Sequence, residues 1–205
     1  MNDLEDFIHA EDIIPALIKI GLIHAQFETI HPFLDGNGRL GRLLITFWLC
    51  QQEILSEPLL YLSYYFKKNR MEYYDRLMKV RTDGDWEGWI KFFLKGIWEV
   101  ADEAISSAKQ INILREESQK KLISSRSSNQ RNSFVLLDSL FKHPVTSKQN
   151  IKELLNVTLQ TATSYIDSFV KLGILQDYTP ERKRKKRYVF GEYLVILERG
   201  TELEG

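Results

Sequence analysis

Apolar residues recur at spacings of three and four along much of the chain, which is the spacing of an amphipathic helix. The first clear case covers residues 15–30, and its apolar positions are Leu17, Ile20, Ile23, Phe27 and Ile30. Pro15 is tolerated in the first turn of such a helix. We expect the helix to end at the His31-Pro32 step, because a residue that precedes proline is disfavoured in the α conformation.

The same periodicity predicts three more helices in the first 122 residues. One runs from Asn37 to about Gln52, and because its middle is apolar nearly all round we expect it to form the buried centre of a helical domain. Residues 66–80 form the next helix. The polar turn at residues 82–85 can cap a long helix that begins near Trp86 and continues to about Leu122.

The pattern changes after residue 124. Residues 124–130 are rich in serine and asparagine and predict a linker. The elements expected beyond it are helices over residues 133–142, 147–155 and 159–172, and short strands over residues 174–178 and 187–190. A charged hairpin tip, residues 181–186, separates the strands. Three helices followed by a hairpin with a basic tip are typical of a winged helix.

Composition sets modest limits on function. The 205 residues carry a formal net charge of zero, so charge alone implies no polyanion or membrane partner. The single cysteine, Cys50, excludes an internal disulfide and fits a reducing compartment. Because the sequence has neither an apolar run of membrane-spanning length nor a leader at Met1, we expect a soluble, cytoplasmic protein.

The densest chemistry lies in residues 31–42, HPFLDGNGRLGR. Asp35 is a short carboxylate, and a carboxylate together with phosphate oxygens is a common way to hold Mg²⁺. Gly36 and Gly38 allow backbone amides to approach a phosphate. A helix that begins at Asn37 favours negative charge at its N-terminus.

Three basic side chains complete this segment. Arg39 and Arg42 lie three residues apart on one side of the predicted helix and can bind further phosphate oxygens. His31 can accept a proton from an incoming hydroxyl group. The segment therefore predicts a site that handles a nucleotide triphosphate.

A dinucleotide-binding alternative fails on context. Residues 36–41, GNGRLG, satisfy the pattern GxGxxG, but that fingerprint requires a preceding strand and a βαβ unit. Here a helix is expected before the glycines, and no strand is expected within the next thirty residues. We therefore retain phosphate binding and reject the dinucleotide fold.

Residues 31–42 resemble the signature of the Fic (Fido) family, HPFx(D/E)GNGRxxR, and fill every defining position. The resemblance implies transfer of AMP from ATP to a hydroxyl group of a tyrosine, threonine or serine in a target protein. It implies that His31 is the general base and that Asp35 is the Mg²⁺ ligand. The residues that it implies for ATP binding are Gly36, Asn37, Gly38, Arg39, Leu40, Gly41 and Arg42, with Arg42 at the γ-phosphate.

The resemblance extends to about residue 100. Residues 69–77 are similar to the family's helix beside the adenine pocket, which implies that Tyr73 or Tyr74 contacts the base, although aromatic residues at helical spacing are as often part of the core. Arg81 is a weaker candidate. We expect a mainly α protein in which a Fic helical domain is followed by a winged helix-turn-helix domain with a small β-hairpin. We also expect the Fic domain to lack its N-terminal part, which in this family contains the target-docking flap and the inhibitory helix.

This interpretation divides the chain into a Fic catalytic domain over residues 1–105, a helical extension and linker over 106–130, and a winged helix domain over 131–205. The last part carries 12 lysine and arginine residues against nine aspartate and glutamate residues, mostly because of the wing tip, so that a DNA backbone contact is reasonable. However, the expected recognition helix, residues 158–171, has no arginine to read guanine. Protein docking or formation of a homodimer through this domain is an equal alternative.

Two further alternatives stay open. The chain is either an active AMP transferase or a truncated, catalytically weak Fic protein that acts as a DNA-binding or regulatory module. The same site could also remove AMP from a modified protein. The other histidines, His9, His24 and His143, have no obvious metal-binding partner and are expected to be structural.

Overall fold

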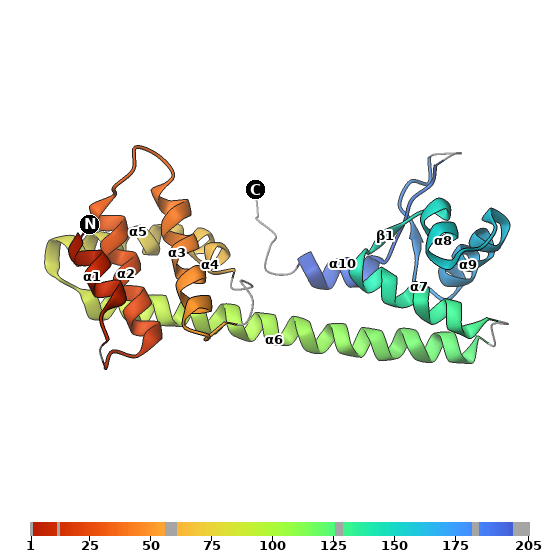
Figure 1. Cartoon of the computed structure of the whole chain (residues 1–205), viewed down its shortest axis with the longest axis horizontal. Helices are drawn as coiled ribbons and strands as arrows, with labels where there is room; N and C mark the ends of the chain where they lie inside the picture. The colour runs from red at the N-terminus through yellow and green to blue at the C-terminus, as the bar shows by residue number, and fades with distance from the viewer. Residues whose placement is uncertain (1, 12, 56–60, 126–128, 182–184, 199–205) are drawn as a thin grey trace. The chain divides into compact units, whose positions relative to one another are not determined.

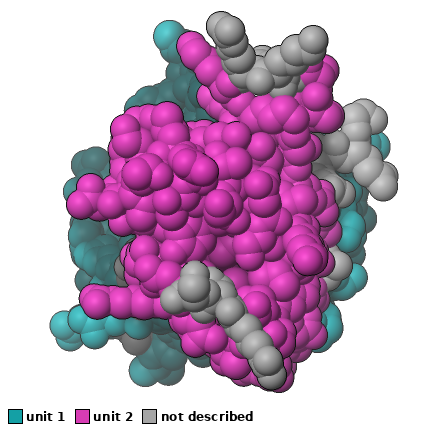
Figure 2. All heavy atoms as spheres, turned by 90° about the vertical axis from the view of Figure 1, so that its right-hand side faces the viewer, with its two compact units in different colours: residues 1–104, 203–205 teal, residues 105–202 magenta. Residues whose placement is uncertain are grey.

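The computed structural model describes residues 2–11, 13–55, 61–125, 129–181 and 185–198 (Figure 1). It is mainly helical, as predicted. The described residues form two compact units, which Figure 2 colours separately: one within residues 2–104 and the other within residues 105–198. The boundary between them falls within the long helix α6, and the three-part division into domains stays a prediction.

Unit 1 is built from five helices and the first part of a sixth. They are α1 (Asn2–His9), α2 (Ala16–Ile30), α3 (Asn37–Gln51), α4 (Leu62–Lys68), α5 (Arg70–Asp83) and α6 (Trp86–Ser124). The expected helices over residues 15–30 and 37–52 are confirmed to within a residue, and α1 was not predicted.

The helix expected over residues 66–80 is two helices, α4 and α5, which meet at Asn69. The Asn69 side chain donates a hydrogen bond to the Tyr65 carbonyl (3.0 Å), and its backbone N–H donates to the same oxygen. Asparagine side chains compete in this way with the backbone pattern of a helix. The apolar periodicity continues across the break, and for that reason the sequence pattern missed it.

The core of unit 1 forms where α2, α4, α5 and α6 meet. Trp89 and Phe93 of α6 are fully buried, and the Trp89 indole N–H donates to the Gly21 carbonyl in α2 (2.8 Å). The start of α6 is fixed by Asp85, whose carboxylate accepts from the Gly88 N–H (2.9 Å), so the turn at residues 82–85 caps this helix as predicted.

The expectation that α3 would be buried all round is wrong. Ile45, Trp48 and Leu49 are buried, but Leu43 and Phe47 are exposed, and Phe47 retains 60% of its accessible surface. Only one side of α3 packs on unit 1, chiefly on α2. An apolar composition alone did not show which side that would be.

Unit 2 contains the second part of α6 and seven further elements. They are α7 (Gln130–Lys142), β1 (Val145–Thr146), α8 (Lys148–Leu155), α9 (Leu159–Lys171), β2 (Gln176–Asp177), β3 (Tyr188–Val189) and α10 (Gly191–Glu198). The strands form an antiparallel sheet in the order β1-β3-β2, with Val189 opposite both Val145 and Gln176. The three expected helices and two expected strands are present, whereas β1 and α10 were not predicted.

Side chains at the helix ends specify much of this unit. Asn129, Ser147 and Thr158 each accept a hydrogen bond from the backbone three residues later and so cap α7, α8 and α9. Gly173 takes a positive φ of 71° where α9 ends, which glycine adopts without strain. The centre of the predicted wing tip, residues 182–184, lies outside the described residues.

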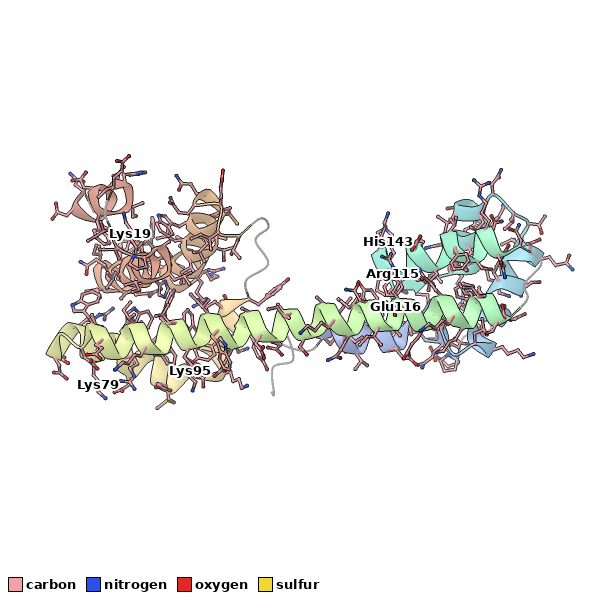
Figure 3. All side chains as sticks on the ribbon, turned by 90° about the horizontal axis from the view of Figure 1, so that it is seen from below. Lys19, Lys79, Lys95, Arg115, Glu116 and His143 are labelled. Carbon is pink, nitrogen blue, oxygen red and sulfur yellow. The ribbon has the colours of Figure 1, made fainter. Side chains whose placement is uncertain are left out.

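Helix α6 packs on α7 within unit 2. Arg115, labelled in Figure 3, pairs with Asp138 of α7 at 3.0 Å and lies over the Phe141 ring at 5.1 Å. Leu114 and Leu122 of α6 are buried in the same apolar core as Phe169 and Phe190. The C-terminal half of α6 therefore belongs to the core of unit 2.

No helix in the described part of the chain is both long enough and apolar enough to cross a membrane.

Gly96 provides a test of the packing of α6 in unit 1. A Cβ atom at this position would lie 2.5 Å from the Tyr65 ring, so we expect Gly96→Ala to destabilise unit 1 by about 1–3 kcal/mol despite alanine's better helix propensity. All four tryptophans, at positions 48, 86, 89 and 98, lie in unit 1, so urea unfolding followed by tryptophan fluorescence measures this unit.

The control for this prediction is Lys95→Ala, one residue away on the exposed face of α6 (Figure 3). This change should alter the free energy of unfolding by less than about 0.5 kcal/mol. A Gly96→Ala variant as stable as the control would contradict the close packing of Tyr65 on α6.

Candidate active site

The predicted nucleotide-handling segment connects the C-terminus of α2 to the N-terminus of α3. His31 ends α2 in the left-handed conformation (φ 50°, ψ 57°), and its N–H donates to the Phe27 carbonyl at 3.0 Å. Pro32 disfavours the right-handed α conformation at His31, which explains why α2 stops here as expected. The His31 side chain is exposed at this end of the helix.

The Asn37 side chain fixes the loop through hydrogen bonds to its backbone. Its side-chain oxygen accepts from the Phe33 N–H (2.9 Å) and its side-chain nitrogen donates to the Phe33 carbonyl (2.6 Å). Asn37 retains only 2% of its accessible surface. Asn37, which the sequence predicted to bind phosphate, therefore uses both polar atoms of its side chain to bond to the loop backbone. In this structure Asn37 fixes the conformation of the loop.

Phe33 is partly exposed although it is a large apolar side chain. It retains 49% of its surface and leans on the Phe27 ring, with 6.4 Å between the ring centroids. The Asn37 clamp accounts for this placement, because it fixes the Phe33 backbone at the protein surface.

Asp35, Gly36 and Arg39 form the exposed tip of the loop. One Asp35 carboxylate oxygen accepts from the Gly36 N–H (2.6 Å), and the other lies 3.8 Å from the Arg39 guanidinium. Gly36 has a positive φ of 83°, which explains the need for glycine at the start of α3. Both charged side chains are largely exposed.

The side chains of this loop can be compared with the ligands that the implied Mg²⁺ would require. No group of three or more histidine, cysteine, aspartate or glutamate side chains in the described part of the chain could hold a metal ion. Mg²⁺ bound through one carboxylate, waters and substrate phosphates needs no such group. The exposed second oxygen of Asp35 fits that mode of binding.

The remaining glycines of the motif differ in their surroundings. A Cβ atom on Gly38 would meet the Arg42 guanidinium at 3.2 Å, so a side chain here would compete with Arg42 for space. A Cβ atom on Gly41 would lie 2.6 Å from a carboxylate oxygen of Glu28, so Gly41 allows α3 to approach α2 closely. Leu40 is partly exposed on the other side of α3.

His24 lies behind the loop and joins three helices. Its Nδ1 is 3.0 Å from the Gly41 carbonyl, and its Nε2 is 3.0 Å from the Tyr73 hydroxyl. A carbonyl only accepts, so Nδ1 donates to Gly41 and Nε2 accepts from Tyr73. The imidazole is fully buried, and burial lowers its pKa to about 4. His24 is therefore a neutral structural histidine, as expected.

The two candidate tyrosines have different environments. Tyr73 is buried in the core, where burial raises the pKa of its hydroxyl group and that group donates to His24. Tyr74 is 55% exposed, packs edge-on against Tyr73, and has the Arg70 guanidinium 5.7 Å from its ring. The core interpretation therefore fits Tyr73, and Tyr74 is the ring of the pair that faces solvent.

The structure adds Glu28 to this region, which the sequence analysis missed. Its side chain is 7% exposed, and one carboxylate oxygen has no hydrogen-bond partner. Burial raises the pKa of this carboxyl group, although the positive charges of His31, Arg42 and Arg81 oppose the increase. The only sequence signal was its position four residues after His24, on the same face of α2.

Arg81 approaches the same place from α5. Its guanidinium donates to the Glu28 carbonyl (2.5 Å) and to the Thr29 hydroxyl (3.3 Å). A cation is favourable at the C-terminus of a helix. Arg81, the weaker candidate in the sequence, therefore caps the end of α2 next to His31.

The buried His24 makes stability depend on pH. Between its unfolded pKa of 6.5 and its folded pKa of about 4, the unfolded chain binds a proton that the native state does not. The stability that neutral His24 contributes is complete above pH 6.5 and is lost as the pH falls from 6.5 to about 4. We expect wild-type unit 1 to lose roughly 3 kcal/mol more than His24→Gln between pH 7 and pH 4. Urea unfolding by tryptophan fluorescence measures this difference, and parallel pH profiles would contradict it.

Glu28 should act in the opposite sense. Its raised pKa means that the native state keeps a proton that the unfolded chain releases above about pH 4.5, so stability falls as the pH rises. Glu28→Gln should remove this decrease, and Glu5→Gln, at an exposed position of α1, should not. If both variants keep the wild-type profile above pH 4.5, the buried carboxylate does not titrate as described.

Comparisons with known proteins agree on one family. Residues 1–49 match the model of the Fic/DOC family. The probable protein adenylyltransferase aq_aa38 of Aquifex aeolicus (strain VF5) is 39% identical over 56 residues, which are 27% of this chain and 18% of that protein. A Fic family protein from Desulfovibrio desulfuricans G20 aligns with a TM-score of 0.51 and 21% identity.

The extent of these matches limits what each of them means. The structural alignment covers 92% of this chain and 53% of the neighbour, and at this identity it shows a shared fold. The chain spans about a fifth of the curated relative and about half of the structural neighbour. The family match contains the whole of α2, the loop and most of α3. Residues 1–49 therefore carry the sequence of the Fic/DOC family, and the chain shares the fold of a Fic family protein.

Proposed function

We propose that this protein transfers AMP from ATP to a hydroxyl-bearing side chain of a target protein, with the His31 loop as the reaction site. The observation that carries the proposal is the exposed side chain of His31 at the end of α2, on the loop before α3 that Asn37 fixes. The curated relative is named as a probable protein adenylyltransferase, which supports the same chemistry and a protein as acceptor.

In this reaction His31 acts as the general base. It accepts the proton of the acceptor hydroxyl group as that oxygen attacks the α-phosphorus of ATP. A new phosphorus–oxygen bond forms, the bond from the α-phosphorus to the bridging oxygen breaks, and pyrophosphate leaves. The end of α2 fixes the backbone of His31, so the imidazole needs only side-chain rotation to reach the hydroxyl group.

The start of α3 would bind the phosphates. The first amides of a helix have no carbonyl partner within it and carry a partial positive charge. Arg39 and Arg42 extend from the same end of α3 and would neutralise charge on the phosphate oxygens. Asp35 would hold Mg²⁺, which would supply further charge neutralisation when bound. Tyr74 is the exposed ring that would contact the adenine.

The test is His31→Ala with His9→Ala, another exposed histidine of unit 1, as the matched control. With α-labelled ATP, Mg²⁺ and a cell lysate, we expect His31→Ala to lose transfer by at least about 100-fold, because a positioned base contributes that much or more. ATP binding, measured by calorimetry, should change little. Transfer by His31→Ala at the wild-type rate would refute the role of His31.

Two alternatives predict different results in the same assay. If His31→Ala and wild type both bind ATP but neither transfers label, the chain is the catalytically weak, regulatory form. If wild type instead releases AMP from a previously labelled protein, and His31→Ala does not, the site works in the direction of removal. Formation of a homodimer, the alternative role of the winged helix domain, is measured by sedimentation.

A further inference from the structure

Unit 2 contains a basic groove that the AMP transfer does not use. The groove is a cavity of about 890 Å³ that is lined by β1, the first turn of α8 and residues 185–187, which precede β3. Four of its lining residues are cations: Lys148, Lys185, Lys186 and Arg187. None of the described lining residues is acidic, so the cavity wall has a net positive charge.

One of these cations has a structural partner and the other three do not. Lys186 pairs with Asp177 (2.5 Å), which holds the pKa of that carboxyl group below its usual range and joins the chain before β3 to β2. Within the described ranges, Lys148, Lys185 and Arg187 form no ion pair. The charges of these three side chains are therefore available to an anionic partner in the groove.

The place of Lys148 adds to this argument. It is the first residue of α8, where the partial positive charge of the helix end disfavours a cation. Ser147 already caps the helix through the Asn150 N–H, so Lys148 does not serve the helix itself. Its charge is best compensated by an anion in the groove.

The lining also distinguishes between classes of nucleic acid. Single-stranded binders present aromatic rings on which bases stack, and no described lining residue of this cavity is aromatic. Leu159 lines the cavity and begins α9, whose exposed Gln160, Thr161 and Ser164 are uncharged donors and acceptors. A helix with such a face fits the major groove of B-form DNA, whereas the major groove of duplex RNA is too narrow to admit it.

From these observations we propose that the groove binds the phosphate backbone of double-stranded DNA, with Lys148, Lys185 and Arg187 as the phosphate contacts. The contacts are independent of sequence because they reach only the backbone. The groove belongs to unit 2, whereas the His31 loop belongs to unit 1.

The experiment measures binding of the full chain to a 20-base-pair DNA duplex by fluorescence anisotropy over a range of salt concentrations. The triple variant Lys148→Gln, Lys185→Gln, Arg187→Gln should bind more weakly, and the slope of log K against log salt should become shallower by about three, close to one per lost phosphate contact. Circular dichroism of each variant establishes that it is folded.

The matched control removes the same charge from unit 2 outside the groove: Lys109→Gln, Lys120→Gln, Lys152→Gln. We expect the control to keep a slope close to that of wild type, which separates a local contact from a net-charge effect. Should the triple variant fail to fold, the three single variants are measured, and each should reduce the slope by about one.

Three results would overturn the proposal. The first is wild-type protein that does not bind the DNA duplex at low salt. The second is equal loss in the groove variant and in the control. The third is tighter binding to a duplex RNA or to a single strand of the same length than to the DNA duplex.

Discussion

A neutral imidazole buried between three helices supports the rest of unit 1. His24 of α2 donates to the Gly41 carbonyl in α3 and accepts from the Tyr73 hydroxyl in α5, and it is stacked on Phe66 and Trp89. Burial lowers the pKa of the imidazole to about 4, so the ring is neutral and its Nε2 accepts from Tyr73. This one side chain therefore joins the three helices that carry His31, Arg39 and Arg81, in addition to their apolar packing.

The motif separates into residues that build the loop and residues that face solvent. Gly36, Asn37 and Gly41 build it: a positive φ, a clamp on Phe33 and close contact of α3 with α2. His31, Asp35 and Arg39 face solvent on that support. A loop whose backbone is fixed from below loses little conformational entropy when a nucleotide binds, so more of the interaction energy remains as affinity.

Sequence patterns predicted most helices of the fold, although not α1 or α10, but they did not show what each side of a helix contacts. Apolar spacing located α2 and α3, and Pro32 located the end of α2, because both signals are local. The break at Asn69 and the exposed side of α3 depend on contacts that spacing does not contain. The same holds for the site: its solvent-facing residues come from one contiguous segment, while Arg81 reaches the end of α2 from 52 residues further along the chain. Glu28 was missed because nothing in its neighbours indicates burial of a carboxylate.

Glu28 adds to the site a buried carboxyl group that lies outside the motif and offsets the positive charge of the arginines. The C-terminus of α2 carries a partial negative charge, to which Glu28 adds a carboxyl group, and the Arg81 guanidinium donates to the Glu28 carbonyl there. The positive charge of Arg42 also lowers the pKa of the Glu28 carboxyl group. A carboxylate without a hydrogen-bond partner on one oxygen is costly when buried, and the neighbouring cations offset that cost. Phosphate groups that attract Arg42 would draw positive charge away from Glu28 and so favour its protonated form. In the proposed function, nucleotide binding at α3 would therefore be coupled to proton uptake by Glu28 through the Arg42 guanidinium.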